Sequence, residues 1–190
     1  MALGQHHGLP TRLLDWSDGA LMALHFAVRS KPRNDPADAI VYAIDPFRFG
    51  KYLDTLSETK CAEKRWKRYV RKHPQDELPE DEPERVYLPA GEEDLKELSR
   101  PAVPLFLDFP HITRRVAAQR SRFLVFGADP AWLAKEATKP GCLIEAIIVD
   151  GDSCYRIRRE LRDSGITESV IFPDLDGLGR EMRQLWLDRK

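Results

Sequence analysis

The chain has 190 residues, of which 42% are hydrophobic and 32% are charged, and this composition suits one globular domain of about 100–200 residues. Its 30 Lys and Arg residues nearly balance its 31 Asp and Glu residues, so net charge does not favour binding to nucleic acid or to a membrane. No apolar run approaches the ~18 residues of a membrane-spanning helix, and Met1–Leu14 lacks the pattern of a secretory signal.

The cysteines indicate the compartment. Cys61, Cys142 and Cys154 are scattered along the chain and form no CxxC pair. Unpaired thiols of this kind are typical of a reducing environment. We therefore expect a cytoplasmic protein.

Near its start the chain places polar residues among apolar ones, in the stretch QHHGLPTRLLDWSDGALMALHFA, Gln5–Ala27. Ser17 and Asp18 are typical helix-capping residues, and they precede a helix predicted over Gly19–Arg29. This helix is apolar nearly all round, which predicts that Ala20–Ala27, including Phe26, is buried in the core.

The next segments alternate between apolar and charged. Ala39–Ile44 reads as a buried strand. Seven basic residues then occur between Lys60 and Lys72, in a predicted helix, and six acidic residues occur between Asp76 and Glu84. We expect residues 72–89 to form a flexible charged loop, because this segment cannot bury enough apolar surface to offset the entropy of ordering.

The basic helix allows two interpretations. Trp66 and Tyr69 are three residues apart and share a face, and basic residues with interleaved aromatics can dock nucleic acid. Alternatively, Trp66 and Val70 pack inward while the charges face water. The dense acidic run that follows favours the second interpretation.

The second half of the chain alternates strands and helices more clearly. Central strands are predicted at Ala39–Ile44, Phe123–Phe126 and Leu143–Val149, with a last short strand at Ser169–Asp174. Helices are predicted at 110–119, 129–141, 153–165 and 175–190, several with recognisable start and stop residues. The helix over 153–165 has a predicted apolar side of Cys154, Ile157 and Leu161. The fold class is therefore α+β, a single mixed α/β domain over residues 1–190.

Several common sites are not indicated. The histidines keep no metal-ligand spacing with each other or with a cysteine, so no metal is expected. There is no G-x-S-x-G elbow and no phosphate-binding glycine run.

Two groups of polar residues are candidates for a functional site. Gln5, His6, Arg12 and Asp15 lie among apolar neighbours, and they form either a buried network with an Arg12–Asp15 contact or a ligand cleft. Arg115 and Gln119 would share a helix face, where they could bind a ribose or phosphate or simply cap backbone groups. On physical grounds these alternatives stay open.

Three blocks of the sequence resemble the FRG domain family. The stretch Gln5–Ala27 resembles the family signature Gln-His-Tyr-Gly-Leu-Pro-Thr-Arg-Leu-Leu-Asp-Trp-Thr. The segments RVAAQRSRF and ESVIFPDLDGL resemble its second and closing blocks. The Phe/Tyr-Arg-Gly motif for which the family is named does not precede Gln5, so this chain would lack the family's N-terminal segment.

The layout of that family is similar to the ADP-ribosyltransferase fold, with a central, mostly antiparallel sheet. The resemblance implies that NAD is the substrate. It implies that Ser17 and Gln119 take the catalytic positions and that Gln5, His6, Arg12, Asp15 and Arg115 bind the cofactor. A neutral Gln119 could hydrogen-bond the nicotinamide ribose but would stabilise its developing positive charge poorly.

Three hypotheses follow. The chain is an NAD-related transferase or its inactive shortened form, in a prophage, toxin or defence setting. It is instead a non-catalytic module that binds a nucleotide or, less favoured, nucleic acid. Or it is a purely structural domain. No membrane partner is expected, and the sequence leaves the oligomeric state undetermined.

Overall fold

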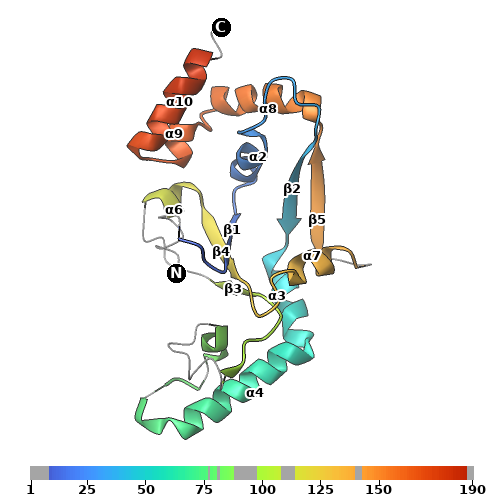
Figure 1. The fold of residues 1–190 in the computed structure, drawn as a ribbon, viewed down its shortest axis with the longest axis vertical. Coiled ribbons are helices and arrows are strands. Elements are labelled where there is room, and N and C mark those ends of the chain that lie inside the picture. The colour runs from blue at the N-terminus through green and yellow to red at the C-terminus, as the bar shows by residue number, and fades with distance from the viewer. Residues whose placement is uncertain are drawn as a thin grey trace. The chain divides into compact units, whose positions relative to one another are not determined.

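The computed structural model describes residues 9–76, 78–80, 82–87, 98–107, 114–139 and 143–187. They form a mixed α/β fold, which confirms the predicted class (Figure 1). In chain order the elements are β1 (Leu13–Ser17), α2 (Ala20–Val28), β2 (Ala39–Ile44), α3 (Pro46–Thr55), α4 (Ser57–Lys72), η1 (Pro74–Asp76), η2 (Pro83–Tyr87), β3 (Leu105–Leu107), α6 (Arg114–Ala118), β4 (Ser121–Val125), α7 (Trp132–Ala137), β5 (Ile144–Val149), α8 (Gly151–Asp163), α9 (Glu168–Ile171) and α10 (Leu175–Leu187).

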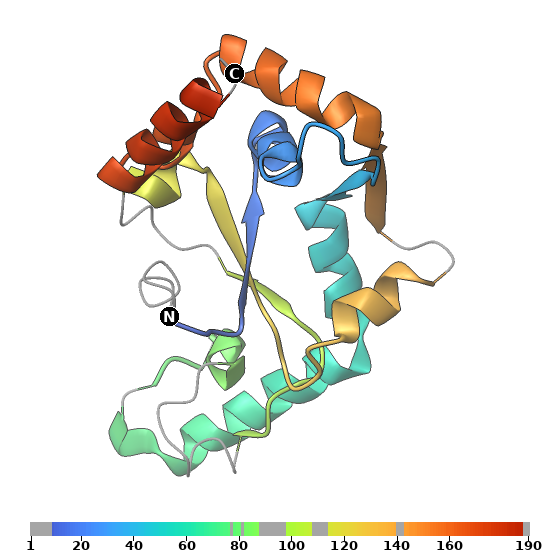
Figure 2. The same cartoon turned by 45° about the horizontal axis from the view of Figure 1, so that its top comes forward.

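The strands form two small sheets. The first has the order β1-β4-β3 and the second pairs β2 with β5 (Figure 2). β3 runs antiparallel to β4, with Leu105 opposite Val125 and Leu107 opposite Phe123. The amide of Asp18 donates to the carbonyl of Arg120, and that of Phe126 donates to the carbonyl of Arg12. These bonds join the start of one strand to the end of the other, so β1 and β4 are antiparallel as well.

Two compact units share the chain. Unit 1 comprises Met1–Leu14, Ile44–Leu107 and Phe123–Ile144. Unit 2 comprises Asp15–Ala43, Asp108–Arg122 and Glu145–Lys190. Each unit is therefore assembled from segments that are distant in sequence.

The core of unit 1 lies along α3 and α4. Phe49 of α3 is fully buried and meets Phe106 and Trp132 edge to face. Trp66 of α4 is buried and stacks on Tyr69 at 5.8 Å between ring centroids. The inward-packing interpretation of the basic helix is therefore confirmed, and its aromatic rings are not available to stack on bases.

The segment 72–89 meets α4 at several described residues. Nε1 of Trp66 donates to the carbonyl of Pro79 at 2.8 Å, and Val86 and Tyr87 are buried. The end of this segment is therefore packed at Val86 and Tyr87, because α4 offers them an apolar face. The mobility of the segment stays a prediction.

The core of unit 2 lies between α2 and α8. Val28, Ala39, Val149, Cys154 and Leu161 form one buried cluster. Cys154 and Leu161 confirm the predicted apolar side of α8. That helix begins where Asp150 accepts from the amide of Ser153, and it ends at Asp163, two residues before Gly165, whose φ of 84° suits glycine.

The burial predicted for α2 is wrong in part. The helix forms as expected, but among its residues only His25 and Val28 are buried, and Phe26 is 38% exposed. One face of α2 packs against α8, and Phe26 lies off that face with its ring edge to face against Phe172. The composition of α2 predicted apolar neighbours on all sides of the helix, whereas in the fold α8 covers one side of it.

Two strand predictions also need correction. β2, β4 and β5 match the predicted strands closely, but β2 and β5 form a two-stranded sheet in which Tyr42 and Ile148 are exposed, so they are not central. The last predicted strand, Ser169–Asp174, is wrong. Its first residues belong to helix α9, because Thr167 caps the helix by accepting from the amide of Val170.

Candidate functional site

The residues predicted as a site do not all fall in one unit. Gln5 and His6 lie outside the described residues. Asp15 is exposed on β1. Arg12, in unit 1, donates from Nη1 to the carbonyl of Phe126 at 2.7 Å and from Nη2 to the carbonyl of Tyr87 at 2.6 Å. These two charge-assisted bonds give Arg12 a structural role, which is to join segments distant in sequence.

Ser17 and Gln119, the two predicted catalytic residues, meet in unit 2. Oγ of Ser17 donates to the main-chain carbonyl of Gln119 at 2.7 Å, although 102 residues separate them. The same oxygen accepts from the amide of Gly19 at 3.1 Å. The hydroxyl at the end of β1 therefore fixes the end of α6 and the start of α2 together.

The side chain of Gln119 is held beside β4. Its Oε1 lies 3.5 Å from Oγ of Ser121, whereas its buried Nε2 has no hydrogen-bond partner among the described residues. The chain turns sharply after it, since Arg120 adopts a φ of 50°. An unsatisfied buried donor is costly, so Gln119 carries a hydrogen-bonding capacity that a ligand could use.

Arg115, predicted to bind a cofactor, belongs to a cluster of arginines around one aromatic ring. Its guanidinium carbon lies 4.6 Å from the centroid of the Phe172 ring. The guanidinium carbons of Arg29 and Arg180 lie at the same distance of 4.6 Å from that centroid. No two of the three carbons can therefore be more than twice that distance apart. Phe172 itself is buried, so its ring is a fixed platform for three cations.

A buried carboxylate completes this cluster. The side chain of Glu168, at the start of α9, is only 2% exposed. Oε1 lies 3.2 Å from Nε2 of His25 and 3.0 Å from Nε of Arg29. Oε2 accepts from Nη2 of Arg29 at 3.1 Å and from Nε of Arg180 at 3.0 Å. A single carboxylate thus connects α2, α9 and α10.

The site carries more positive than negative charge. Among the described residues, Glu168 pairs with Arg29 and Arg180, while Arg115 has no acidic partner. Burial is the largest cause that lowers the pKa of Arg29; the charges of Arg180 and Arg115 lower it further, and Glu168 opposes them. Within the described part of the chain, mutual repulsion among the arginines is therefore only partly offset.

His25 adds no charge to this balance near neutral pH. Burial lowers its pKa below the ordinary value of about 6.5, against the opposing effect of Glu168. The imidazole is then neutral, and its Nε2 can donate to Glu168. The arrangement is three guanidinium groups, one carboxylate and one neutral imidazole, which is suited to binding an anion.

The sequence prediction missed His25, Arg29, Glu168, Phe172 and Arg180. One signal was available for three of them, since His25 lies within the stretch Gln5–Ala27, and Glu168 and Phe172 lie within the block ESVIFPDLDGL, both of which resemble the family. For Arg29 and Arg180 no local pattern exists, because their shared contacts arise from the packing of α2, α9 and α10.

Other kinds of site find no support in the part of the chain that the structure describes. No three His, Cys, Asp or Glu side chains gather there as metal ligands. No helix there is both long enough and apolar enough to cross a membrane.

Comparisons with known proteins identify a family match for one part of the chain. No curated protein and no solved structure matches it. A family model, described as the FRG domain, matches residues 1–36, which include β1 and α2, with Arg12, Ser17, His25 and Arg29. The second and closing blocks of the resemblance lie outside the matched range. The chain therefore carries an FRG domain match in residues 1–36, as the resemblance of Gln5–Ala27 predicts.

Proposed function

We propose that unit 2 binds the phosphate groups of a nucleotide, with NAD as the first candidate. The observation that carries this proposal is the cluster of Arg29, Arg115 and Arg180 around the ring of Phe172. Guanidinium groups present planar pairs of donors that match phosphate oxygens, and they are the side chain preferred for phosphate recognition.

Charge balance supports an anionic ligand. Glu168 is the acidic partner of Arg29 and Arg180, and it leaves Arg115 without one among the described residues. The side chains of Arg29 and Arg180 are 27% and 41% exposed, so a ligand can approach them. A phosphate bound here would offset the repulsion that lowers the pKa of Arg29.

Rigidity supports binding as well. Glu168 fixes Arg29 and Arg180 by direct hydrogen bonds, and the Phe172 ring limits where all three guanidinium groups can lie. Donors that are already held in place lose less entropy when a ligand binds.

An NAD-related transferase, or its inactive form, is the second candidate, and the bond between Ser17 and Gln119 favours it. The side-chain amide of Gln119 has no hydrogen-bond partner among the described residues and could donate to a ribose hydroxyl. A neutral amide, however, would not stabilise an oxocarbenium-like centre as a carboxylate would. We therefore expect NAD binding with little or no nicotinamide release.

Isothermal titration calorimetry with NAD, pyrophosphate and adenosine tests the binding proposal. NAD and pyrophosphate should bind, and adenosine, which lacks phosphate, should bind at least about tenfold more weakly. Arg180→Gln should weaken pyrophosphate binding, whereas Arg183→Gln, an exposed position on the same helix, should not. Adenosine binding as tightly as NAD would contradict phosphate recognition.

The same samples test the second candidate. Nicotinamide released from NAD is measured by chromatography for the wild-type chain and for Gln119→Ala. Release that disappears in Gln119→Ala would establish the transferase-like activity and overturn the expectation of binding without turnover.

A further inference from the structure

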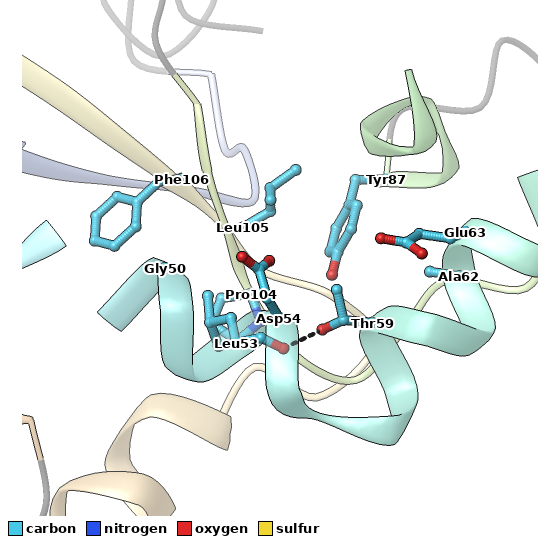
Figure 3. Close-up of a pocket in the computed structure, with 10 residues that line it drawn as sticks. All are labelled: Gly50, Leu53, Asp54, Thr59, Ala62, Glu63, Tyr87, Pro104, Leu105 and Phe106. Carbon is cyan, nitrogen blue, oxygen red and sulfur yellow. Dashed lines mark hydrogen bonds between the residues drawn. The ribbon is translucent and has the colours of Figure 1, made fainter. Parts of the chain in front are cut away.

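A cavity of about 120 Å³ lies in unit 1, separate from the arginine cluster (Figure 3). Its wall is formed by α3, α4, η2 and β3, and by the residue that precedes β3. The residues that line it are Gly50, Leu53, Asp54, Thr59, Ala62, Glu63, Tyr87, Pro104, Leu105 and Phe106.

Most of this wall is apolar and fixed. Leu53 and Ala62 are buried, and Phe106 packs edge to face against the fully buried Phe49 at 5.6 Å. Oγ1 of Thr59 donates to the carbonyl of Leu53 at 2.7 Å, which ties the start of α4 to the end of α3. The cavity is therefore part of the packed unit, and its walls need no rearrangement to form.

Two carboxylates stand at this apolar wall. In Figure 3 the side chains of Asp54, from α3, and Glu63, from α4, point toward the same space as the Tyr87 hydroxyl. Within the described part of the chain, neither carboxylate has a hydrogen-bond or ion-pair partner, and none of the lining residues is basic.

This combination has an electrostatic consequence. Asp54 and Glu63 are both exposed, so water screens them in part, but the apolar wall beside them lowers the local dielectric constant and their like charges repel each other more strongly than in bulk water. A cation placed between them would remove that repulsion, and hydrocarbon attached to the cation would cover the apolar wall.

We infer that this cavity binds an ammonium or guanidinium group carried on a short hydrocarbon stem. An engineered cavity of about 150 Å³ accommodates benzene, so a stem of about four carbons fits the volume here. Asp54 and Glu63 would receive the cationic group, and Leu53, Leu105 and Phe106 would contact the stem. The ligand's chemistry is shared by a free alkyl amine and by the side chain of Lys or Arg in another protein.

Titration of the whole chain with small probes tests this inference. The probes are n-butylammonium, n-butylguanidinium, 1-butanol and butyrate, followed by amide chemical shifts and calorimetry. The two cations should bind at least about tenfold more tightly than butanol, and butyrate should not bind. The shifts should be largest at Gly50, Ala62 and Phe106, which line the cavity.

Variants test whether the charges of Asp54 and Glu63 contribute to cation binding. Asp54→Asn and Glu63→Gln should each weaken butylammonium binding several-fold. Glu58→Gln, an exposed acidic position on α4 that does not line the cavity, should leave it unchanged. Circular dichroism establishes whether each variant is folded. Asp54→Asn and Glu63→Gln are expected to fold, because both positions are exposed.

The source of the cation is distinguished by Nα-acetyl-lysine methylamide. Binding as tight as that of butylammonium assigns the cavity to a protein side chain, and exclusion of this larger probe assigns it to a free amine. Equal affinity for butanol and butylammonium, or cation binding that neither carboxylate variant changes, would overturn the inference.

Discussion

Nε2 of His25 on α2 lies 3.2 Å from Oε1 of Glu168 on α9, although 143 residues separate the two in the sequence. Both side chains are buried, and the same carboxylate also binds Arg29 and Arg180. One carboxylate thus connects α2, α9 and α10 within unit 2. Its neighbours include the arginines that we propose bind phosphate, so the stability of this unit and its ligand binding depend on the same residues.

Replacing Glu168 by Gln should destabilise the protein. The substitution removes the negative charge that compensates Arg29 and Arg180 but keeps the size of the side chain. Loss of one partner of a buried ion pair costs about 3–5 kcal/mol, and we expect the lower end because both arginines are partly exposed. Urea unfolding followed by circular dichroism measures this free energy.

The matched control for that change is Glu160→Gln. Glu160 lies on α8 with its side chain 67% exposed, and surface ion pairs contribute about 0–1 kcal/mol. Equal losses in the two variants would contradict the structural role of Glu168.

Stability should depend on pH through His25. Its pKa in the folded state is lowered, mainly by burial, so the unfolded chain binds this proton more readily. The contribution of His25 is therefore fully present above its ordinary pKa of about 6.5 and is lost as pH falls from there toward the lower folded value. Urea unfolding at several pH values between about 5 and 7.5 measures the slope.

His25→Gln removes this titration, so the variant's free energy of unfolding should change less over the same pH range than that of the wild type. An identical slope in both proteins would show that His25 does not titrate differently on folding.

Phe26→Ala should cost about 1–2 kcal/mol, because the ring is 38% exposed and loses only part of its contact with Phe172. Phe49→Ala, at a fully buried ring in unit 1, should cost about 3–5 kcal/mol. The two free energies of unfolding are compared by urea titration. A larger loss of unfolding free energy for Phe26→Ala than for Phe49→Ala would contradict the partial exposure of Phe26 and support the fully buried helix that the sequence predicts.

Gly127→Ala should destabilise the chain strongly. A Cβ atom there would collide with the carbonyl oxygens of Pro101, Ala102 and Val103, which are main-chain atoms and cannot move aside easily. Gly179→Ala is the control, since its Cβ would meet no atom within 4 Å, and alanine is favoured over glycine in a helix by up to about 1 kcal/mol. The Tm of Gly127→Ala should therefore be lower than that of the wild type, and the Tm of Gly179→Ala should be unchanged or higher. Thermal unfolding measures both values.

Local sequence patterns predicted much of the fold because their signals are local. The apolar run Ala39–Ile44 has the bounds of β2, and the apolar spacing of Cys154 and Leu161 identified the inward side of α8. Helix α3 was not predicted, although Asp45 and Pro46 begin it. There the Asp45 side chain accepts from two amides, and the same Asp-Pro pair also reads as the end of a strand.

The site was less predictable. Arg115 and Gln119 were proposed from their spacing on one predicted helix and Ser17 from the family resemblance, and the structure brings Ser17 and Gln119 into contact. Arg12 lies in the other unit, bound to backbone carbonyls. The contacts of Glu168 and Arg180 with Arg29 could not be predicted, because they arise from tertiary packing and nothing in the neighbouring sequence indicates them.

The affinity of pyrophosphate for two neighbouring arginine variants tests the proposed phosphate site most directly. Arg115 contacts Phe172 and has no acidic partner among the described residues, whereas Arg114 is an exposed neighbour on the same short helix. Arg115→Gln should weaken pyrophosphate binding at least about tenfold, since a hydrogen bond to a charged group contributes about 1.5–3 kcal/mol. Arg114→Gln should leave the affinity within about twofold, because an exposed charge outside the site is screened by salt. Equal affinities in the two variants, or no pyrophosphate binding by the wild-type chain, would contradict the account.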